Sequence, residues 1–171
     1  CSGLVGSEMC IRDRFTPFQK ELIDDNWKNQ TLDQDYIKLK DSQALQFQKK
    51  NATLILTQFA YEECLQSSHL GIAMAGTATE QFVGLGKPVI SFPGEGPQFT
   101  QYFAESQTRL LGHSVILVKK PNNSSEVLKK LLSDKKLINS ISKNGKKRMG
   151  KSGASKRIAK YLVNKCFDDL G

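Results

Sequence analysis

The chain has 171 residues, with 25 Lys and Arg against 17 Asp and Glu, a formal net charge of +8. This length suits one domain with a sizeable core, and no apolar run approaches the roughly 18 residues that cross a bilayer. The four cysteines have no CxxC spacing, and the chain has only two histidines. We therefore expect neither a disulfide framework nor a zinc site. We expect Cys64 and Cys166 to be small apolar core residues, and the compartment to be reducing, hence cytoplasmic.

The start of the chain resembles a translated sequencing adapter. Residues 8–14, "EMCIRDR", permit the codons GAG ATG TGT ATA AGA GAC AGG, which match the transposase adapter end used in library preparation. The alternative is an ordinary N-terminal segment in which Cys1 and Cys10 are redox-active. We expect residues 1–14 to be an artefact and the chain to be truncated at its front. Residues 15–50 are then a remnant of an upstream region.

Residues 15–50 are polar, and they suggest only a helix around Phe18 and a short edge strand at 35–40. From residue 51 strands and helices alternate. The predicted strands are 52–57, 70–75, 87–92 and 114–118. The predicted helices are 59–68, 77–86, 98–111 and 124–134, the last of them opened by serine caps. Two lysine-rich helices follow, separated by Gly150–Gly153.

This alternation indicates the fold class. Strands that alternate with helices of about ten residues form βαβ units and a parallel sheet. We therefore expect residues 51–171 to be an α/β domain with a Rossmann-like parallel sheet flanked by helices.

The segment 71–100, "GIAMAGTATEQFVGLGKPVISFPGEGPQFT", carries the most informative pattern. A buried strand ends at Ala75, Gly76 permits a tight turn, and a helix opens at Thr77. The backbone N–H groups of Thr77, Ala78 and Thr79 are expected to point out of the carboxyl edge of the sheet. Unpaired donors and the helix dipole attract phosphate there, and open α/β sheets bind ligands at that edge.

The Gly-Thr pair alone is explained more simply as a turn with an N-cap, and the glycine fingerprint of dinucleotide folds is absent. A second loop strengthens the functional interpretation, because "FPGEGPQFT" at 92–100 leaves the adjacent strand at the same edge. Glu80 and Gln81 follow within one helical turn of the first loop. Polar groups from two loops are therefore expected to converge on one crevice.

These residues carry a resemblance. The segment 74–105, "MAGTATEQFVGLGKPVISFPGEGPQFTQYFAE", resembles the donor-binding half of glycosyltransferases that have two facing Rossmann-like domains, the GT-B fold. It is most similar to the lipid-A-disaccharide synthase-related proteins of cyanobacteria. The tail at 144–162, "NGKKRMGKSGASKRIAKYL", resembles their closing helix pair, so the likeness runs from about residue 51 to 162.

The resemblance implies that the chain is the C-terminal half of an inverting hexosyltransferase. Its substrate would be a nucleoside-diphosphate sugar, UDP-linked, and no cofactor is expected. The acceptor would be lipid-linked or a glycolipid, held by an N-terminal domain that also carries the general base. No catalytic residue is therefore assigned in this chain, which by itself is expected not to turn over.

The resemblance also implies roles for individual residues. Gly76, Thr77 and Ala78 would face the diphosphate, and Glu80 would accept hydrogen bonds from the ribose hydroxyls. In the disaccharide synthase itself, "SGTAALE" places the acid one position later, where this chain has Gln81. The ribose contact could therefore belong to Glu80 or to Gln81.

In the second loop, the residues that resemble the family's segment near the sugar and the pyrophosphate are Gly94, Gly96, Gln98, Phe99 and Thr100. Gln98 and Thr100 are equally well explained as helix caps. The predicted donor-binding residues are Gly76, Thr77, Ala78, Thr79, Glu80, Gln81, Gly94, Gly96, Gln98, Phe99 and Thr100.

Other candidates are weaker. His69 and His113 have no carboxylate or metal partner at useful spacing and are expected to lie on the surface. A basic face is formed by Lys146, Lys147, Arg148, Lys151, Lys156, Arg157 and Lys160. It is either a solvated helix surface or a contact for anionic lipid headgroups at the inner face of a membrane.

Two alternative functions remain. One is a UDP-N-acetylglucosamine 2-epimerase-like enzyme, whose donor loop also carries acids near Glu80. The other is a basic nucleic-acid-binding module that uses the lysine-rich helices. Few aromatic residues accompany those lysines, so platforms for stacking bases are lacking and no nucleic-acid partner is expected.

Overall fold

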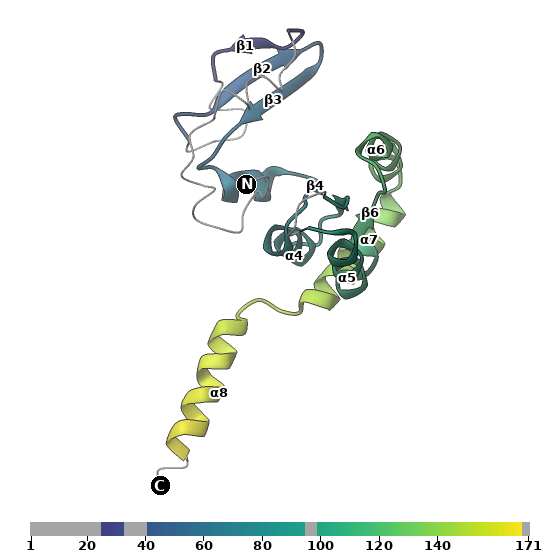
Figure 1. The fold of residues 1–171 in the computed structure, drawn as a ribbon. Helices are drawn as coiled ribbons and strands as arrows, with labels where there is room; N and C mark the ends of the chain where they lie inside the picture. The colour runs from purple at the N-terminus through teal and green to yellow at the C-terminus, as the bar shows by residue number, and fades with distance from the viewer. Residues whose placement is uncertain (1–24, 33–40, 95–98, 169–171) are drawn as a thin grey trace.

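The computed structural model describes residues 25–32, 41–94 and 99–168. Within these ranges the chain forms two separate three-stranded sheets and a series of helices, shown in Figure 1. The predicted helix around Phe18, the predicted edge strand at 35–40 and the segment 1–14 lie outside the described residues.

The first sheet is antiparallel. Its strands are β1 (Lys28–Gln30), β2 (Leu45–Lys49) and β3 (Ala52–Leu56), paired in that order. A two-residue turn, Lys50 and Asn51, joins β2 to β3. Lys50 has a φ of 52°, the left-handed conformation that tight hairpin turns use.

This hairpin corrects two sequence predictions. The run 52–57 is not the first strand of the parallel sheet, because it pairs antiparallel with β2. A two-residue connection joins only antiparallel neighbours, since a parallel pair needs a crossover of a dozen or more residues. The predicted domain start at residue 51 falls inside the turn, so residues 45–56 belong to one hairpin.

Asp41 joins the two ends of this hairpin. It is 2% exposed, and its carboxylate accepts hydrogen bonds from the Thr57 hydroxyl and from the N–H groups of Gln43, Gln58 and Phe59. Burial acts to raise the pKa of Asp41, but these four donors outweigh it and hold the pKa below its usual value of 3.8.

The second sheet is parallel, and it confirms the α/β class. Its strands are β4 (Gly71–Ile72), β5 (Val89–Ser91) and β6 (Val115–Leu117), in the order β4-β5-β6. The helices around and beyond it are α3 (Tyr61–Ser67), α4 (Gly76–Gly84), α5 (Gln101–Leu111), α6 (Ser124–Ser133), α7 (Lys135–Met149) and α8 (Ala154–Asp168). Short 3₁₀ turns, η1 (Gly112–Ser114) and η2 (Pro121–Asn123), precede β6 and α6.

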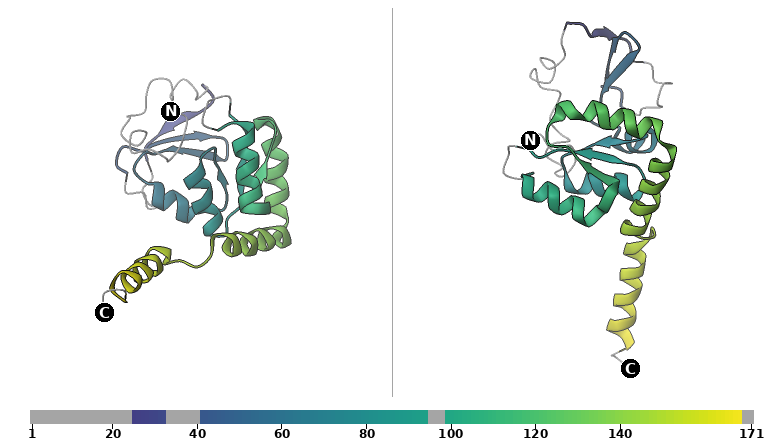
Figure 2. Two further views of the ribbon diagram at one scale, coloured as in Figure 1. Left: turned by 60° about the horizontal axis from the view of Figure 1, so that its bottom comes forward. Right: turned by 90° about the vertical axis from the view of Figure 1, so that its right-hand side faces the viewer.

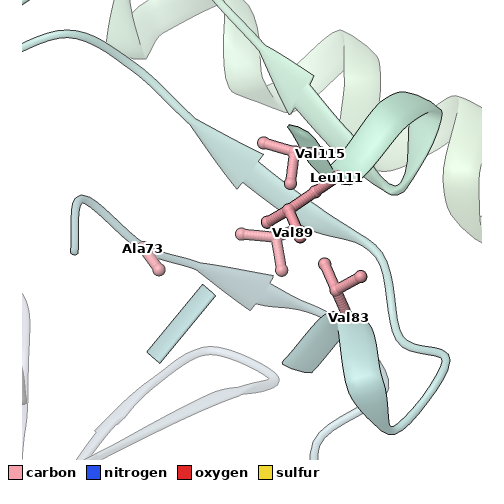
Figure 3. Packing of buried hydrophobic residues seen from close by; sticks show 5 residues of the cluster. All are labelled: Ala73, Val83, Val89, Leu111 and Val115. Carbon is pink, nitrogen blue, oxygen red and sulfur yellow. The ribbon is translucent and has the colours of Figure 1, made fainter. Parts of the chain in front are cut away.

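Side chains of the central strand β5 alternate between two cores. Val89 packs against α4 and α5 in a cluster with Ala73, Val83, Leu111 and Val115, which Figure 3 shows. Ile90 belongs to a second cluster, which includes Leu131 of α6 and Ile141 of α7. Since successive residues of a strand point to opposite faces, the parallel sheet is covered by helices on both sides.

Helix α7 closes the domain by crossing the ends of α4 and α5. Asn144 donates to the Leu111 carbonyl at 2.8 Å, and Arg148 donates to the Leu110 carbonyl at 3.0 Å. Gly145 packs directly against the backbone carbonyl of Val83. These contacts satisfy carbonyls that the last turn of α5 leaves without intrahelical donors.

Hydrogen bonds at both ends of helix α3 connect it to α4 and to the segment before β5. Lys87 donates to the Leu65 and Gln66 carbonyls at 2.6 and 2.7 Å, at the C-terminal end of α3. Burial lowers the pKa of Lys87. At the other end of α3, the Tyr61 hydroxyl donates to Gln81 Oε1 on α4.

The two cysteines differ. Cys64 is half-buried beside Ala60 and Ala44, as expected, and burial together with the nearby Glu63 and Asp41 raises the pKa of its thiol. Cys166 is exposed on α8, so its prediction as a core residue is wrong. That prediction followed the general tendency of free cysteines to be buried, but α8 projects away from the body in Figures 1 and 2.

Two predicted helix starts also change. Helix α4 begins at Gly76 with Ala75 as N-cap, one residue before the predicted Thr77. Helix α6 has Asn123 as N-cap instead of a serine, and the Ser124 hydroxyl is buried without a partner. Within the described residues, none of the helices combines the length and the apolar character that crossing a bilayer requires.

Candidate functional site

The first predicted loop and the described part of the second leave the parallel sheet at the same edge. Strands β4 and β5 are parallel neighbours, with Gly71 opposite Val89 and Ile72 opposite Ile90. The first turn of α4, which follows β4, and the segment that follows Ser91 therefore leave the sheet at its carboxyl edge. This is the edge at which open α/β sheets bind ligands.

The first turn of α4 has no side-chain cap. Its N-cap residue, Ala75, is extended, with φ −146° and ψ 147°, and carries no hydrogen-bonding side chain. The first intrahelical bond runs from the Thr79 N–H to the Ala75 carbonyl at 3.4 Å. Among the described residues, no acceptor takes the N–H groups of Gly76, Thr77 and Ala78, which thus remain free to bind an anion.

The predicted donor triplet of residues 77–79 therefore moves by one residue, to 76–78. Thr79 is fully buried, and its hydroxyl donates to the Ala75 carbonyl at 2.6 Å. It stabilises the helix start and does not face a ligand. Thr77 is exposed, so its hydroxyl is the one that remains at the surface of this turn.

Helix α5 forms a wall beside this turn. Gln107 Nε2 donates to the Gly76 carbonyl at 3.2 Å, and a Cβ on Gly76 would lie 3.8 Å from the Phe103 ring. That distance is an ordinary van der Waals contact, so the fold itself does not demand glycine at position 76. Gln107 is 5% exposed, and its Oε1 has no hydrogen-bond partner among the residues that the structure describes.

Glu80 and Gln81 are placed differently. Gln81 Oε1 accepts the hydroxyl hydrogen of Tyr61, and this contact turns the amide toward α3. Burial raises the pKa of Tyr61, which keeps it a donor over the physiological range. Glu80 is half-buried and has no hydrogen-bond partner among the described residues, so its carboxylate is free to accept.

The described part of the second loop is held by internal contacts. The Gly94 N–H donates to the Phe99 carbonyl at 2.8 Å, and the Phe99 ring packs against Phe103 with centroids 5.2 Å apart. Thr100 is the N-cap of α5 and accepts from the Phe103 N–H at 3.3 Å. Phe99 and Thr100 thus shape the loop, and the predicted Gly96 and Gln98 lie outside the described residues.

Sequence reasoning missed two features of this edge. Lys119 and Lys120 follow β6 and are exposed, and β6 is the parallel neighbour of β5, so both lysines lie at the carboxyl edge. Gln107 occupies an inward position of α5, between the buried Ala104 and Leu111. The sequence signal that could have identified Gln107 is a glutamine on a helix face whose other residues are apolar.

The remaining candidates behave as surface residues. His69 and His113 are exposed, and His113 Nε2 lies 3.1 Å from the Ser140 hydroxyl. In the part of the chain that the structure describes, no three His, Cys, Asp or Glu side chains gather closely enough to hold a metal ion. The chemistry available at the edge is recognition of an anion by backbone N–H groups, flanked by a carboxylate and an amide.

Comparisons of the chain with protein-family models, with curated proteins and with solved structures find no match in any of the three.

Proposed function

We propose that this chain is the donor-binding domain of an inverting glycosyltransferase related to lipid-A-disaccharide synthase. In this proposal the parallel sheet belongs to a Rossmann-like domain, the C-terminal half of a GT-B enzyme. It binds a UDP-sugar, from which the hexose passes to a lipid-linked or glycolipid acceptor. The family is inferred from the resemblance of residues 74–105. The binding chemistry is inferred from the groups at the carboxyl edge of the parallel sheet.

The observation that carries the proposal is the uncapped first turn of α4. Three backbone N–H groups, from Gly76 to Ala78, lack acceptors among the described residues at the carboxyl edge of the sheet. Such a turn binds the oxygens of a diphosphate through hydrogen bonds and the helix dipole. Stabilising the charge that develops on the leaving UDP is a major part of catalysis in group transfer.

The nucleoside end is assigned to Glu80. Its carboxylate has no partner among the described residues, whereas Gln81 already accepts from Tyr61. A carboxylate accepts two hydroxyl hydrogen bonds, which suits the two hydroxyls of a ribose. Lys119 and Lys120 add positive charge at the same edge.

The acceptor and the general base are assigned to a preceding domain of the enzyme. Donor binding is therefore the activity expected of the present chain, and sugar transfer by this chain alone would contradict that division. We further assign the lysine-rich segment 135–166 to anionic lipid headgroups at the cytoplasmic face of a membrane, where a lipid-linked acceptor would be found.

UDP titration of two variants at position 76 tests the proposal. Gly76→Pro removes one N–H and fills its place with the ring. Proline is tolerated at the first helical position, and the extended Ala75 suits the residue before proline. Gly76→Ala is the matched control, because it keeps the N–H and its Cβ meets only ordinary contacts.

We expect wild type to bind UDP, measured by calorimetry, and to bind uridine at least tenfold more weakly. Gly76→Pro should weaken UDP binding by roughly 10- to 100-fold, the equivalent of one charge-assisted hydrogen bond. Gly76→Ala should stay within about twofold of wild type, since it keeps that hydrogen bond. Equal affinity of wild type for UDP and uridine, or equal loss in both variants, would contradict diphosphate binding at this turn.

A further inference from the structure

Gln107 is a buried polar side chain that contacts the candidate site. It lies on the inward face of α5, between Ala104 and Leu111, where the other side chains are apolar. Its Nε2 donates to the Gly76 carbonyl, and its Oε1 is buried without a hydrogen-bond partner in the described part of the chain. An unpaired buried oxygen destabilises the fold, so retaining an amide here calls for a compensating role.

The contact with Gly76 suggests that role. The Gly76 carbonyl and the Thr77 N–H belong to the same planar peptide unit. A hydrogen bond donated to the carbonyl polarises that unit and makes its N–H a stronger donor. The Thr77 N–H is one of the three that have no acceptor among the described residues.

The same bond also fixes the orientation of the turn. Ala75 provides no side-chain cap, so the start of α4 lacks the usual local restraint. Gln107 reaches it from 31 residues further along the chain, and α5 itself is anchored at its start by the Thr100 cap. A turn held in this way loses less conformational entropy when a ligand binds.

We propose that Gln107 is a positioning residue for the anion: its amide orients the first peptide of α4 and strengthens the Thr77 N–H toward a diphosphate. This inference rests on the proposed function and extends it, because it assigns part of the diphosphate affinity to a side chain that does not touch the ligand.

A purely structural role predicts a different result. If Gln107 served only to join α5 to α4, its replacement would lower stability and affect all ligands alike. Under the proposal, Gln107→Met removes the bond to Gly76 and also the unpaired oxygen, with little change in volume. Stability should then be unchanged or higher, while affinity falls only for ligands that carry the diphosphate.

Ser91→Ala provides the matched control. Ser91 ends β5, is 1% exposed, and its hydroxyl is also buried without a partner. By strand alternation it points to the same face as Val89, the face that α5 covers. It makes no hydrogen bond to α4, so its replacement removes an unpaired polar atom and leaves the turn unchanged.

The experiment compares wild type, Gln107→Met and Ser91→Ala. For each protein it measures the affinity for UDP and for uridine, the midpoint of thermal unfolding and the NMR resonance of the Thr77 amide proton. We expect Gln107→Met to weaken UDP binding roughly 3- to 10-fold, to leave uridine binding within about twofold, and to shift the Thr77 resonance upfield. Ser91→Ala should match wild type in UDP affinity, uridine affinity and the Thr77 resonance. Neither variant should lower the thermal midpoint.

The outcomes separate the inference from the function on which it rests. If wild type binds UDP in preference to uridine and Gln107→Met does so equally well, the inference is wrong and the proposed function stands. A parallel loss of UDP and uridine affinity with a lower midpoint assigns Gln107 to the scaffold and also overturns the inference. If wild type shows no preference for UDP, both fail.

Discussion

Buried polar side chains in this protein fall into two groups. Asp41 has four hydrogen-bond donors around its carboxylate, whereas the hydroxyls of Ser91 and Ser124 and the Oε1 of Gln107 have no partner within the described ranges. A satisfied carboxylate holds a loop in place, while an unpaired polar atom costs stability. Asp41 is therefore a residue through which acid acts on the described part of the fold.

We predict that acid weakens the antiparallel hairpin through Asp41. Because its pKa in the folded protein lies below 3.8, the carboxylate stabilises the fold fully above about pH 4 and loses this contribution as pH falls through the folded-state pKa. Urea unfolding followed by tryptophan fluorescence between pH 7 and pH 2 measures the effect, since Trp27 adjoins β1.

Asp41→Asn is the companion variant. It keeps the shape but replaces one of the two acceptor oxygens with an NH2 group that faces donors, so stability at pH 7 should fall by about 2–4 kcal/mol. Its stability should depend less on pH between 5 and 2 than that of wild type. An unchanged pH profile in the variant would assign the acid sensitivity to other groups.

At the scale of elements, the fit between α4 and α7 depends on glycine. A Cβ on Gly145 would collide with the backbone carbonyl of Val83 and would lie 3.2 Å from Val83 Cγ1. Backbone cannot rotate away as a flexible side chain would. A Cβ on Gly84, in the same interface, would meet only Met149 at 3.7 Å.

We expect Gly145→Ala to lower the free energy of unfolding by about 1–3 kcal/mol, the usual cost of overpacking a core. Gly84→Ala should be neutral or stabilising by up to about 1 kcal/mol, because alanine favours the helix and finds room. Chemical denaturation of both variants measures the difference. Equal effects of the two substitutions would contradict the close approach of α4 and α7.

Which elements the sequence predicted depends on how local their signal is. Helices at α3, α4, α5 and α6 and the strands β5 and β6 follow from periodicity within a window of about ten residues. The strands β1 and β2 were missed because they are short and rich in Gln and Lys. Their formation depends on pairing with β3, which no local window contains.

At the scale of the whole molecule, charge is unevenly distributed. The segment 135–166 contains eleven of the 25 basic residues and none of the 17 acidic ones, so the rest of the chain has a net charge of −3. Arg148 and Arg157 of this segment donate to backbone carbonyls, while its lysines are exposed. Helix α8 adds exposed apolar side chains at Ile158, Tyr161, Leu162 and Val163.

We predict that this segment binds anionic vesicles. A basic helix with an exposed apolar face suits the headgroup region of a membrane. Lys156→Gln with Lys160→Gln should weaken binding to vesicles of phosphatidylcholine with 30% phosphatidylserine by roughly 30-fold, from about 1 kcal/mol per lysine. Lys129→Gln with Lys130→Gln, the same charge change on α6, should have little effect.

Vesicle co-sedimentation at two salt concentrations measures this, with vesicles of phosphatidylcholine alone as reference. Binding should be weak to the neutral vesicles and should fall with added salt. Tighter, steeply salt-dependent binding to an oligonucleotide than to the anionic vesicles would instead favour the nucleic-acid alternative.

The sequence by itself determined the features that depend on neighbouring residues: the alternation of strands and helices, the start of a helix within one residue of Gly76, and the charge of the segment 135–166. Only the tertiary structure decided which distant groups meet. The hydrogen bond from Gln107 to Gly76 spans 31 residues, and the exposure of Cys166 follows because no other described element covers α8. Periodicity tells which face of a helix is apolar, but whether another element covers that face is set by packing of the whole chain.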